Sequence, residues 1–216
     1  MPTMISPASP PPALTSVAQQ YQQTSRGIVV FEMHRVLEAH GAFSSHREDV
    51  VMSGIYDDGA LVKVRVSTYT INGKPAGANQ ISALEQSWEH PDPRDVFAAP
   101  FSASNFAAYA YRDGGPSTID FASPVRDAGH GNGSFMYDAQ NNVVSCTYQP
   151  NALPPHASSG EITDRRSEVL PGYWAVTQEL QQYSGSYGPF SAAGGVQETF
   201  SGFRRFSDLR SALAAL

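Results

Sequence analysis

Three long runs of alternating apolar and polar residues, joined by short connections, constrain the fold of this chain most strongly. The first run covers residues 28–40, and its apolar side is interrupted only by Arg35. That side carries Val29, Phe31, Met33, Leu37 and Ala39. The second and third runs cover residues 46–56 and 60–71, with Asp-Asp-Gly at 57–59 between them. Because strand side chains alternate between two faces, these runs predict three long, half-buried strands, the last two joined by a tight hairpin turn.

The remainder of the chain also favours strands over helices. Shorter strand patterns recur between about residue 106 and residue 206, and 18 glycines and 16 prolines indicate many turns. Apolar residues at helical spacing predict one helix over residues 13–23, and helices also fit residues 79–89 and 207–216. We therefore expect a mainly β fold with one antiparallel sheet of about nine or ten strands and a few covering helices.

The sequence contains no composition break that would mark a second folded unit. Residues 1–12 are rich in proline and are expected to form a disordered tail, and residues 13–216 are expected to form a single β-rich domain. The first 13 residues contain five prolines and no apolar signal region. Two interpretations of location follow, a cytoplasmic protein or a mature protein whose leader has been removed. We favour a periplasmic or secreted location, since such tails often follow a leader.

Charge and cysteine content exclude several classes of partner. The formal net charge is −6, whereas a nucleic-acid binder needs an excess of Lys and Arg, so no nucleic acid is expected. No stretch approaches the roughly 20 apolar residues of an integral membrane span. Cys146 is the only cysteine, so neither an intrachain disulfide nor a multi-thiolate metal site can form. Its strand-like surroundings indicate a packing role.

Candidate catalytic groups are sparse. His34 and His40 share one face of the first strand but are separated by six residues, or roughly 20 Å. A cluster of His40, His46 and Glu48 at the mouth of the hairpin is conceivable. The motifs G-x-S-x-G, S-x-x-K and H-E-x-x-H are absent. We therefore predict no catalytic residue, metal or cofactor, and keep an enzyme that uses a histidine with a carboxylate as an alternative.

The apolar side of the predicted sheet is the more informative feature. A long sheet cannot bury one face unless it closes or is covered. Helical or irregular covers that leave space beneath them would create an apolar pocket for a small hydrophobic ligand or acyl chain. A filled core fits the same pattern, as does a structural or interaction protein with no ligand.

The order of elements resembles the LolA-like periplasmic carriers of outer-membrane lipoproteins. The resemblance rests on a helix ending in Tyr-Gln-Gln-Thr, a very long first hairpin, an Asp-Asp-Gly turn and a strand finishing in Ile-Asn-Gly-Lys-Pro at 71–75. It spans roughly residues 13–206 and implies an unclosed half-barrel with helices as a lid and a concave apolar face that shelters lipid. Arg35 is the position that matches the buried arginine governing lid opening in those carriers. The expected ligand-binding residues are Val29, Phe31, Met33, Arg35, Val62, Val64 and Trp88.

Overall fold

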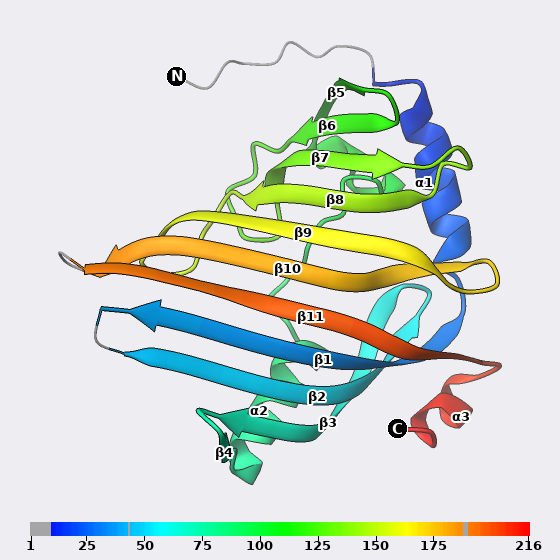
Figure 1. Cartoon of the computed structure of the whole chain (residues 1–216). Coiled ribbons are helices and arrows are strands. Elements are labelled where there is room, and N and C mark those ends of the chain that lie inside the picture. Colours follow the sequence, from blue (N-terminus) through cyan, green and yellow to red (C-terminus); the bar gives the residue numbers. More distant parts are fainter. Residues whose placement is uncertain (1–9, 43, 188–189) are drawn as a thin grey trace.

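Figure 1 shows the computed structural model, which describes residues 10–42, 44–187 and 190–216. Most of the predicted tail, residues 1–12, lies outside the described residues, and the domain boundaries stay predictions. The strands are β1 (Ile28–Gly41), β2 (Ser45–Asp57), β3 (Ala60–Ile71), β4 (Lys74–Pro75), β5 (Ala110–Gly115), β6 (Thr118–Ala122), β7 (Gly131–Tyr137), β8 (Val143–Pro150), β9 (Ala157–Leu170), β10 (Tyr173–Tyr187) and β11 (Phe190–Phe206). The helices are α1 (Ala13–Thr24), α2 (Ala78–Glu89), the short 3₁₀ helix η1 (Ala103–Ala108) and α3 (Leu209–Leu213).

All eleven strands belong to one antiparallel sheet in the order β4-β3-β2-β1-β11-β10-β9-β8-β7-β6-β5. The edge strands β4 and β5 do not pair with each other within the described residues, so the sheet remains an open half-barrel. The sheet has more strands than the nine or ten expected, but the predicted fold class is confirmed. The only non-sequential pairing in this order joins β1 to β11, with Arg35 opposite Glu198.

The three long runs form neighbouring strands as predicted, but two bulges in β3 change its alternation. Tyr56 pairs with Leu61 and Ile55 pairs with Lys63, which leaves Val62 without a partner on β2. A second irregularity falls between Thr68 and Val66. Because a bulge inserts one extra residue, the side chains beyond it change face. Val62 is therefore 38% exposed, whereas a regular strand would have placed it on the same side as Val64.

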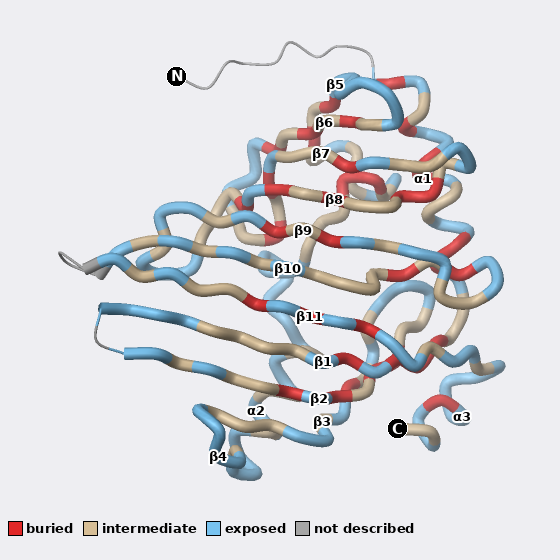
Figure 2. The backbone as a smooth tube through the Cα atoms, viewed as in Figure 1, coloured by how far each residue is buried: buried red, intermediate tan, exposed pale blue. Residues whose placement is uncertain are grey.

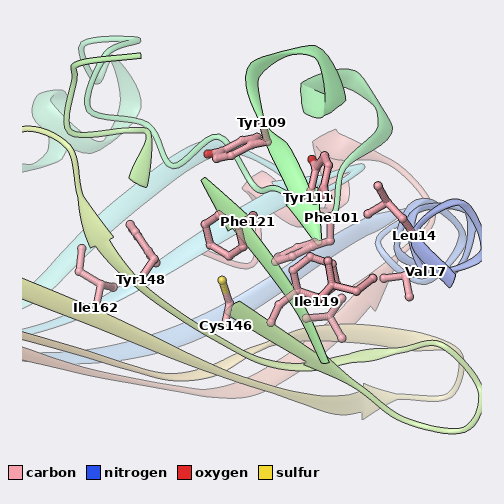
Figure 3. Packing of buried hydrophobic residues seen from close by; sticks show 12 residues of the cluster. Leu14, Val17, Phe101, Tyr109, Tyr111, Ile119, Phe121, Cys146, Tyr148 and Ile162 are labelled. Carbon is pink, nitrogen blue, oxygen red and sulfur yellow. The ribbon is translucent and has the colours of Figure 1, made fainter. Parts of the chain in front are cut away.

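Helices cover the sheet mainly on one face, which we call the inner face. Leu14 and Val17 of α1 pack into a cluster with Phe101 and residues of β5 to β9, as Figure 3 shows. Leu84 and Trp88 of α2 pack on a second cluster around Phe31 at the other end of the sheet. The buried stretches in Figure 2 accordingly lie mostly within the strands and along one side of α1.

The opposite face is covered only locally, by α3. Ala212 is fully buried against Val30 and Ile55, whereas Leu209 and Leu213 are more than one third exposed. The expected helix over residues 207–216 is shorter than predicted, and Asp208 caps it by accepting a hydrogen bond from the backbone of Ser211.

The irregular segment between α2 and β5 crosses the inner face. Two tyrosines at its end and in β5 hold it there. The hydroxyl of Tyr109 donates to the carbonyl of Ala98 at 2.6 Å, and that of Tyr111 donates to the carbonyl of Pro100 at 2.7 Å. Burial raises the pKa of both tyrosines, so the hydroxyls keep the protons that they donate.

The glycine-rich stretch at residues 129–133 has a structural role. Gly131 and Gly133 lie in β7, where a Cβ atom on Gly133 would sit 2.0 Å from the carbonyl oxygen of Thr147 on β8. Only glycine allows this close approach of the two backbones. The end of this stretch therefore forms the start of strand β7.

Helix α2 also completes the edge of the sheet. Strand β4 has two residues and pairs only with the end of β3, so backbone N–H groups of β3 remain unpaired. The carboxylate of Glu85 accepts from the N–H of Val66 at 2.8 Å, and that of Glu89 accepts from the N–H of Val64 at 3.3 Å. Lys63 also pairs with Glu89 at 2.7 Å. Side chains of the helix thus take the place of a missing strand.

We expect replacement of Glu85 by alanine to lower the free energy of unfolding by roughly 1–3 kcal/mol, because a backbone N–H loses a charged acceptor. Urea denaturation followed by circular dichroism measures this change. Gln86→Ala, an exposed change in the same helix, is the control and should stay within about 0.5 kcal/mol of the parent. Equal stabilities of the two variants would show that α2 does not complete the edge.

Candidate functional site

Two adjoining cavities lie between the inner face and its covers. Their volumes are about 840 and 590 Å³, within the range of about 300–1,000 Å³ that is typical of small-molecule sites. The larger reaches Arg35 and Glu198, and the smaller reaches Asp164 and Arg166. The two share the lining residues Tyr56, Trp88, Asp95, Phe97, Val176 and Glu179, which we call the junction.

A single row of directly paired residues crosses the sheet beneath these cavities. The register places one residue of each strand opposite the next, so that their side chains share one face. From β3 to β6 the row is Tyr69, Val50, Arg35, Glu198, Glu179, Asp164, Cys146, Phe135 and Ile119. Its ends include buried apolar residues, but its middle consists of one arginine followed by three acids. We call Glu198, Glu179 and Asp164 the carboxyl row.

Arg35 is engaged at one end of the carboxyl row. Its Nε lies 3.3 Å from Oε1 of Glu198, and its Nη1 lies 3.8 Å from Oε2 of Glu48. Glu48 also accepts from the hydroxyl of Tyr69 at 3.0 Å and contacts Nε2 of His46 at 2.8 Å. Burial acts to raise the pKa of Glu48, but these two hydrogen bonds, with the charge of Arg35, bring it below its ordinary value.

Arg166 is engaged at the other end. Its guanidinium lies 5.1 Å from the centre of the Tyr21 ring and 5.7 Å from that of Phe101, and it donates to the carbonyl of Trp174 at 3.3 Å. These contacts hold the cation against α1 and the covering segment.

The acids between the two arginines cannot all be ionised. Burial, followed by the charge of Glu179, raises the pKa of Glu198 to about 8, although Arg35 opposes this shift. Burial and Glu179 likewise raise the pKa of Asp164 well above its ordinary value. Glu198 therefore holds its proton near neutral pH, and the pKa of Asp164 is shifted in the same direction.

The seven residues predicted to bind a ligand separate into three groups. Arg35 and Trp88 line the larger cavity, and Trp88 belongs to the junction. Four others are buried in the packed core, namely Val29, Phe31, Met33 and Val64. Val62 is exposed at its bulge, so the expectation that it shares the inner face with Val64 is wrong. Contact of these residues with a ligand stays a prediction, and Arg35 and Trp88 are the two that a bound molecule could reach directly.

The histidines do not converge on one site. The register pairs His46 with Ala39, so His46 lies on the inner face and His40 on the opposite face. His46 meets Glu48 as imagined, but His34 pairs with Asp49 and His40 approaches Glu38 instead. Within the described residues, no group of three or more His, Cys, Asp or Glu side chains could hold a metal ion.

Cys146 is fully buried in the cluster under α1, and burial raises the pKa of its thiol. Its predicted packing role is therefore confirmed. In the described part of the chain, no helix has the length and apolar character that crossing a membrane requires.

Sequence reasoning missed the carboxyl row, although one member carried a recognisable signal. Glu198 stands between Val196 and Phe200, two residues away on either side, in the same way that Arg35 stands between Met33 and Leu37. A charge on an otherwise apolar strand face indicates a buried group that needs a partner. The sequence around each residue does not indicate that Glu179 lies beside Glu198, because that depends on the pairing of β10 with β11.

Comparisons with known proteins find similar structures only. No protein-family model and no curated protein matches this chain. An outer membrane lipoprotein-sorting protein domain from Vibrio parahaemolyticus has a TM-score of 0.48 and 13% identity, with 91% of this chain and 93% of that chain covered. A LolA superfamily protein from Nitrosomonas europaea has a TM-score of 0.41 and 7% identity, with 93% and 96% covered. A DUF1329 family protein from Desulfovibrio piger has a TM-score of 0.40 and 10% identity, with 93% and 94% covered.

Each of these three similarities has a TM-score below 0.5 and an identity of 13% or less. What this chain binds has to be inferred from its own side chains.

The carboxyl row makes stability depend on pH. Because the folded chain keeps a proton on Glu198 up to about pH 8, whereas an ordinary glutamate releases it near 4.5, this group favours the folded state at low pH. Its contribution is full below 4.5 and declines as the pH rises to about 8, by at most about 1.4 kcal/mol per pH unit.

We therefore expect the free energy of unfolding of Glu198→Gln to fall less than that of the parent as the pH rises from 4.5 to about 8. Urea denaturation at a series of pH values measures the slopes. Glu161→Gln, an exposed change on β9, should keep the slope of the parent. A parent slope unchanged in Glu198→Gln would contradict the assignment of a buried proton to this carboxyl.

Proposed function

We propose that this chain is a non-enzymatic binding or carrier protein that holds a lipid or another hydrophobic ligand inside its half-barrel. The observation that carries the proposal is the pair of adjoining cavities between the inner face and its covers. The LolA resemblance of the sequence led to the same expectation, together with a periplasmic or secreted location. We retain that location as part of the proposal, and cell fractionation of the native host tests it.

The walls of the cavities suit an amphipathic molecule. Phe97 stacks on Tyr148 with ring centres 4.4 Å apart, and both line the larger cavity beside Trp88 and Phe200. These rings provide apolar surface for an alkyl chain, while the charged groups of Arg35 and Glu179 lie at the floor. A ligand with one apolar end and one polar end fits such a lining better than a purely apolar one.

The covers also suit reversible loading. Apart from the hydroxyls of Tyr109 and Tyr111, the segment before η1 is held by two backbone hydrogen bonds with Gly129, in the loop before β7. The N–H of Ala98 donates to the carbonyl of Gly129, and the N–H of Gly129 donates to the carbonyl of Arg94. Displacement of that segment would open both cavities without breaking any strand pairing.

A probe of neutral charge tests the proposal without assuming a head group. We expect Nile red to gain fluorescence on binding and dodecanol to displace it competitively. Val176→Trp should weaken the binding of Nile red at least about tenfold, because the larger side chain fills the junction.

Val62→Trp is the matched control, since the same bulky residue is then added at the exposed bulge. It should leave the affinity unchanged. Absence of any saturable binding by the parent, or equal loss in both variants, would overturn the proposed function.

A further inference from the structure

We propose that the ligand carries a cationic nitrogen head group, a primary or quaternary ammonium, which lies at Glu179 between the two cavities. This proposal rests on the proposed function and names the class of ligand. Glu179 is the one acid of the carboxyl row that reaches both cavities, so a head group placed there could leave its alkyl chain in either.

The first support is the acidic middle of the row of paired residues on the inner face. Four carboxyl groups lie along this region, those of Glu48 and the carboxyl row, and the guanidinium groups of Arg35 and Arg166 lie at its two ends. Arg94 and Arg126 also line the larger cavity, and Arg94 pairs with Asp92 at 2.6 Å. The two arginines at the ends are already engaged, Arg35 by Glu48 and Glu198 and Arg166 by aromatic rings and a carbonyl. Because Glu198 and Asp164 favour the protonated form, the row carries its full negative charge only when a bound cation displaces these protons, and Glu179 lies at the middle of the row.

The second support is an acceptor left without a partner. Asp164 is 5% exposed and lines the smaller cavity, yet its Oδ1 has no hydrogen-bond partner among the described residues. A buried polar atom without a partner is costly, and a donor bound in the cavity would remove that cost. A primary ammonium group supplies such a donor beside Glu179, whereas a quaternary ammonium group has no N–H and acts there through its charge alone.

The third support comes from the aromatic walls of the junction. Tyr56, Trp88 and Phe97 all line both cavities together with Glu179 and Asp95. The faces of aromatic rings attract cations, most strongly in tryptophan, and aromatic enclosures are a known means of binding quaternary ammonium groups. A site with carboxyl groups and aromatic walls suits a cation, whereas the acids of the row would repel a carboxylate or phosphate head group.

Binding of a permanent cation should displace protons from the row. The titratable groups that face Asp164 and Glu198 are Glu179, Arg35, Arg166, Cys146, Tyr56 and Tyr148. A cation at Glu179 favours the ionised carboxyls, so its affinity should rise as the pH rises toward about 8, near the pKa of Glu198. The affinity for a neutral ligand should not rise with pH in this way.

Isothermal titration calorimetry with four ligands of one chain length tests the head group. The ligands are dodecyltrimethylammonium, dodecylamine, dodecanol and dodecanoate, each used below its micelle concentration. We expect the two ammonium ligands to bind about tenfold more tightly than dodecanol, and dodecanoate to bind more weakly than dodecanol. The affinity for dodecyltrimethylammonium, whose own charge does not change, should increase with pH.

The variants Asp164→Asn and Glu179→Gln remove the charge and keep the shape. Each should reduce the preference for dodecyltrimethylammonium over dodecanol to less than about threefold and leave dodecanol binding unchanged. Glu161→Gln, an exposed change of the same kind on β9, should retain the full preference. If either variant fails to fold, the pH dependence of the affinity of the parent protein for dodecyltrimethylammonium still tests the proposal.

The outcomes separate the two proposals. Equal affinities for the ammonium ligands and dodecanol, or tighter binding of dodecanoate, would overturn the cationic head group and leave the carrier function standing. Failure of all four ligands to bind would overturn both. An ammonium preference that falls with rising pH would contradict the role of the carboxyl row.

Discussion

The inner face of the sheet has to be removed from water, and the rest of the structure follows from that requirement. A closed barrel would bury this face by itself, but here β4 and β5 remain separate edges. The covers come from different parts of the chain, with α1 over one end, α2 over the other and an irregular segment between them. Because these covers meet the sheet mainly at its ends, space remains at the middle.

The charged groups lie where this cover is incomplete. Arg35 and the carboxyl row occupy the central strands of the row, whereas Phe135 and Cys146 occupy the strands that α1 and Phe101 cover tightly. Acids packed under an apolar cover would lose their hydration without compensation. Cavity and charge are therefore parts of one arrangement, in which the groups share protons with each other and remain accessible to a small molecule.

Much of the fold could be predicted from side-chain alternation alone. The first three strands, α1 and α2 were located within one or two residues, because each carries apolar residues at a regular spacing along the sequence. The predicted face of Val62 was wrong because the bulge at this residue cannot be recognised in an alternating pattern of valines and charged residues. Arg35 could be identified as a candidate site residue because it interrupts an apolar strand face. Glu198 could have been identified in the same way. Nothing in the sequence indicates that the backbone amides of β3 are capped by Glu85 and Glu89, as this depends on how α2 packs.

The sequence by itself determined which stretches are strands, which side of each long strand is apolar, and that neither a disulfide nor a strongly basic surface is present. These properties are local, since they depend on the spacing of side chains along the chain. Only the tertiary structure decided which charged residues become neighbours. Glu198, Glu179 and Asp164 are 15 or more residues apart in sequence, and a shift of one residue in any pairing would turn one of them to the opposite face.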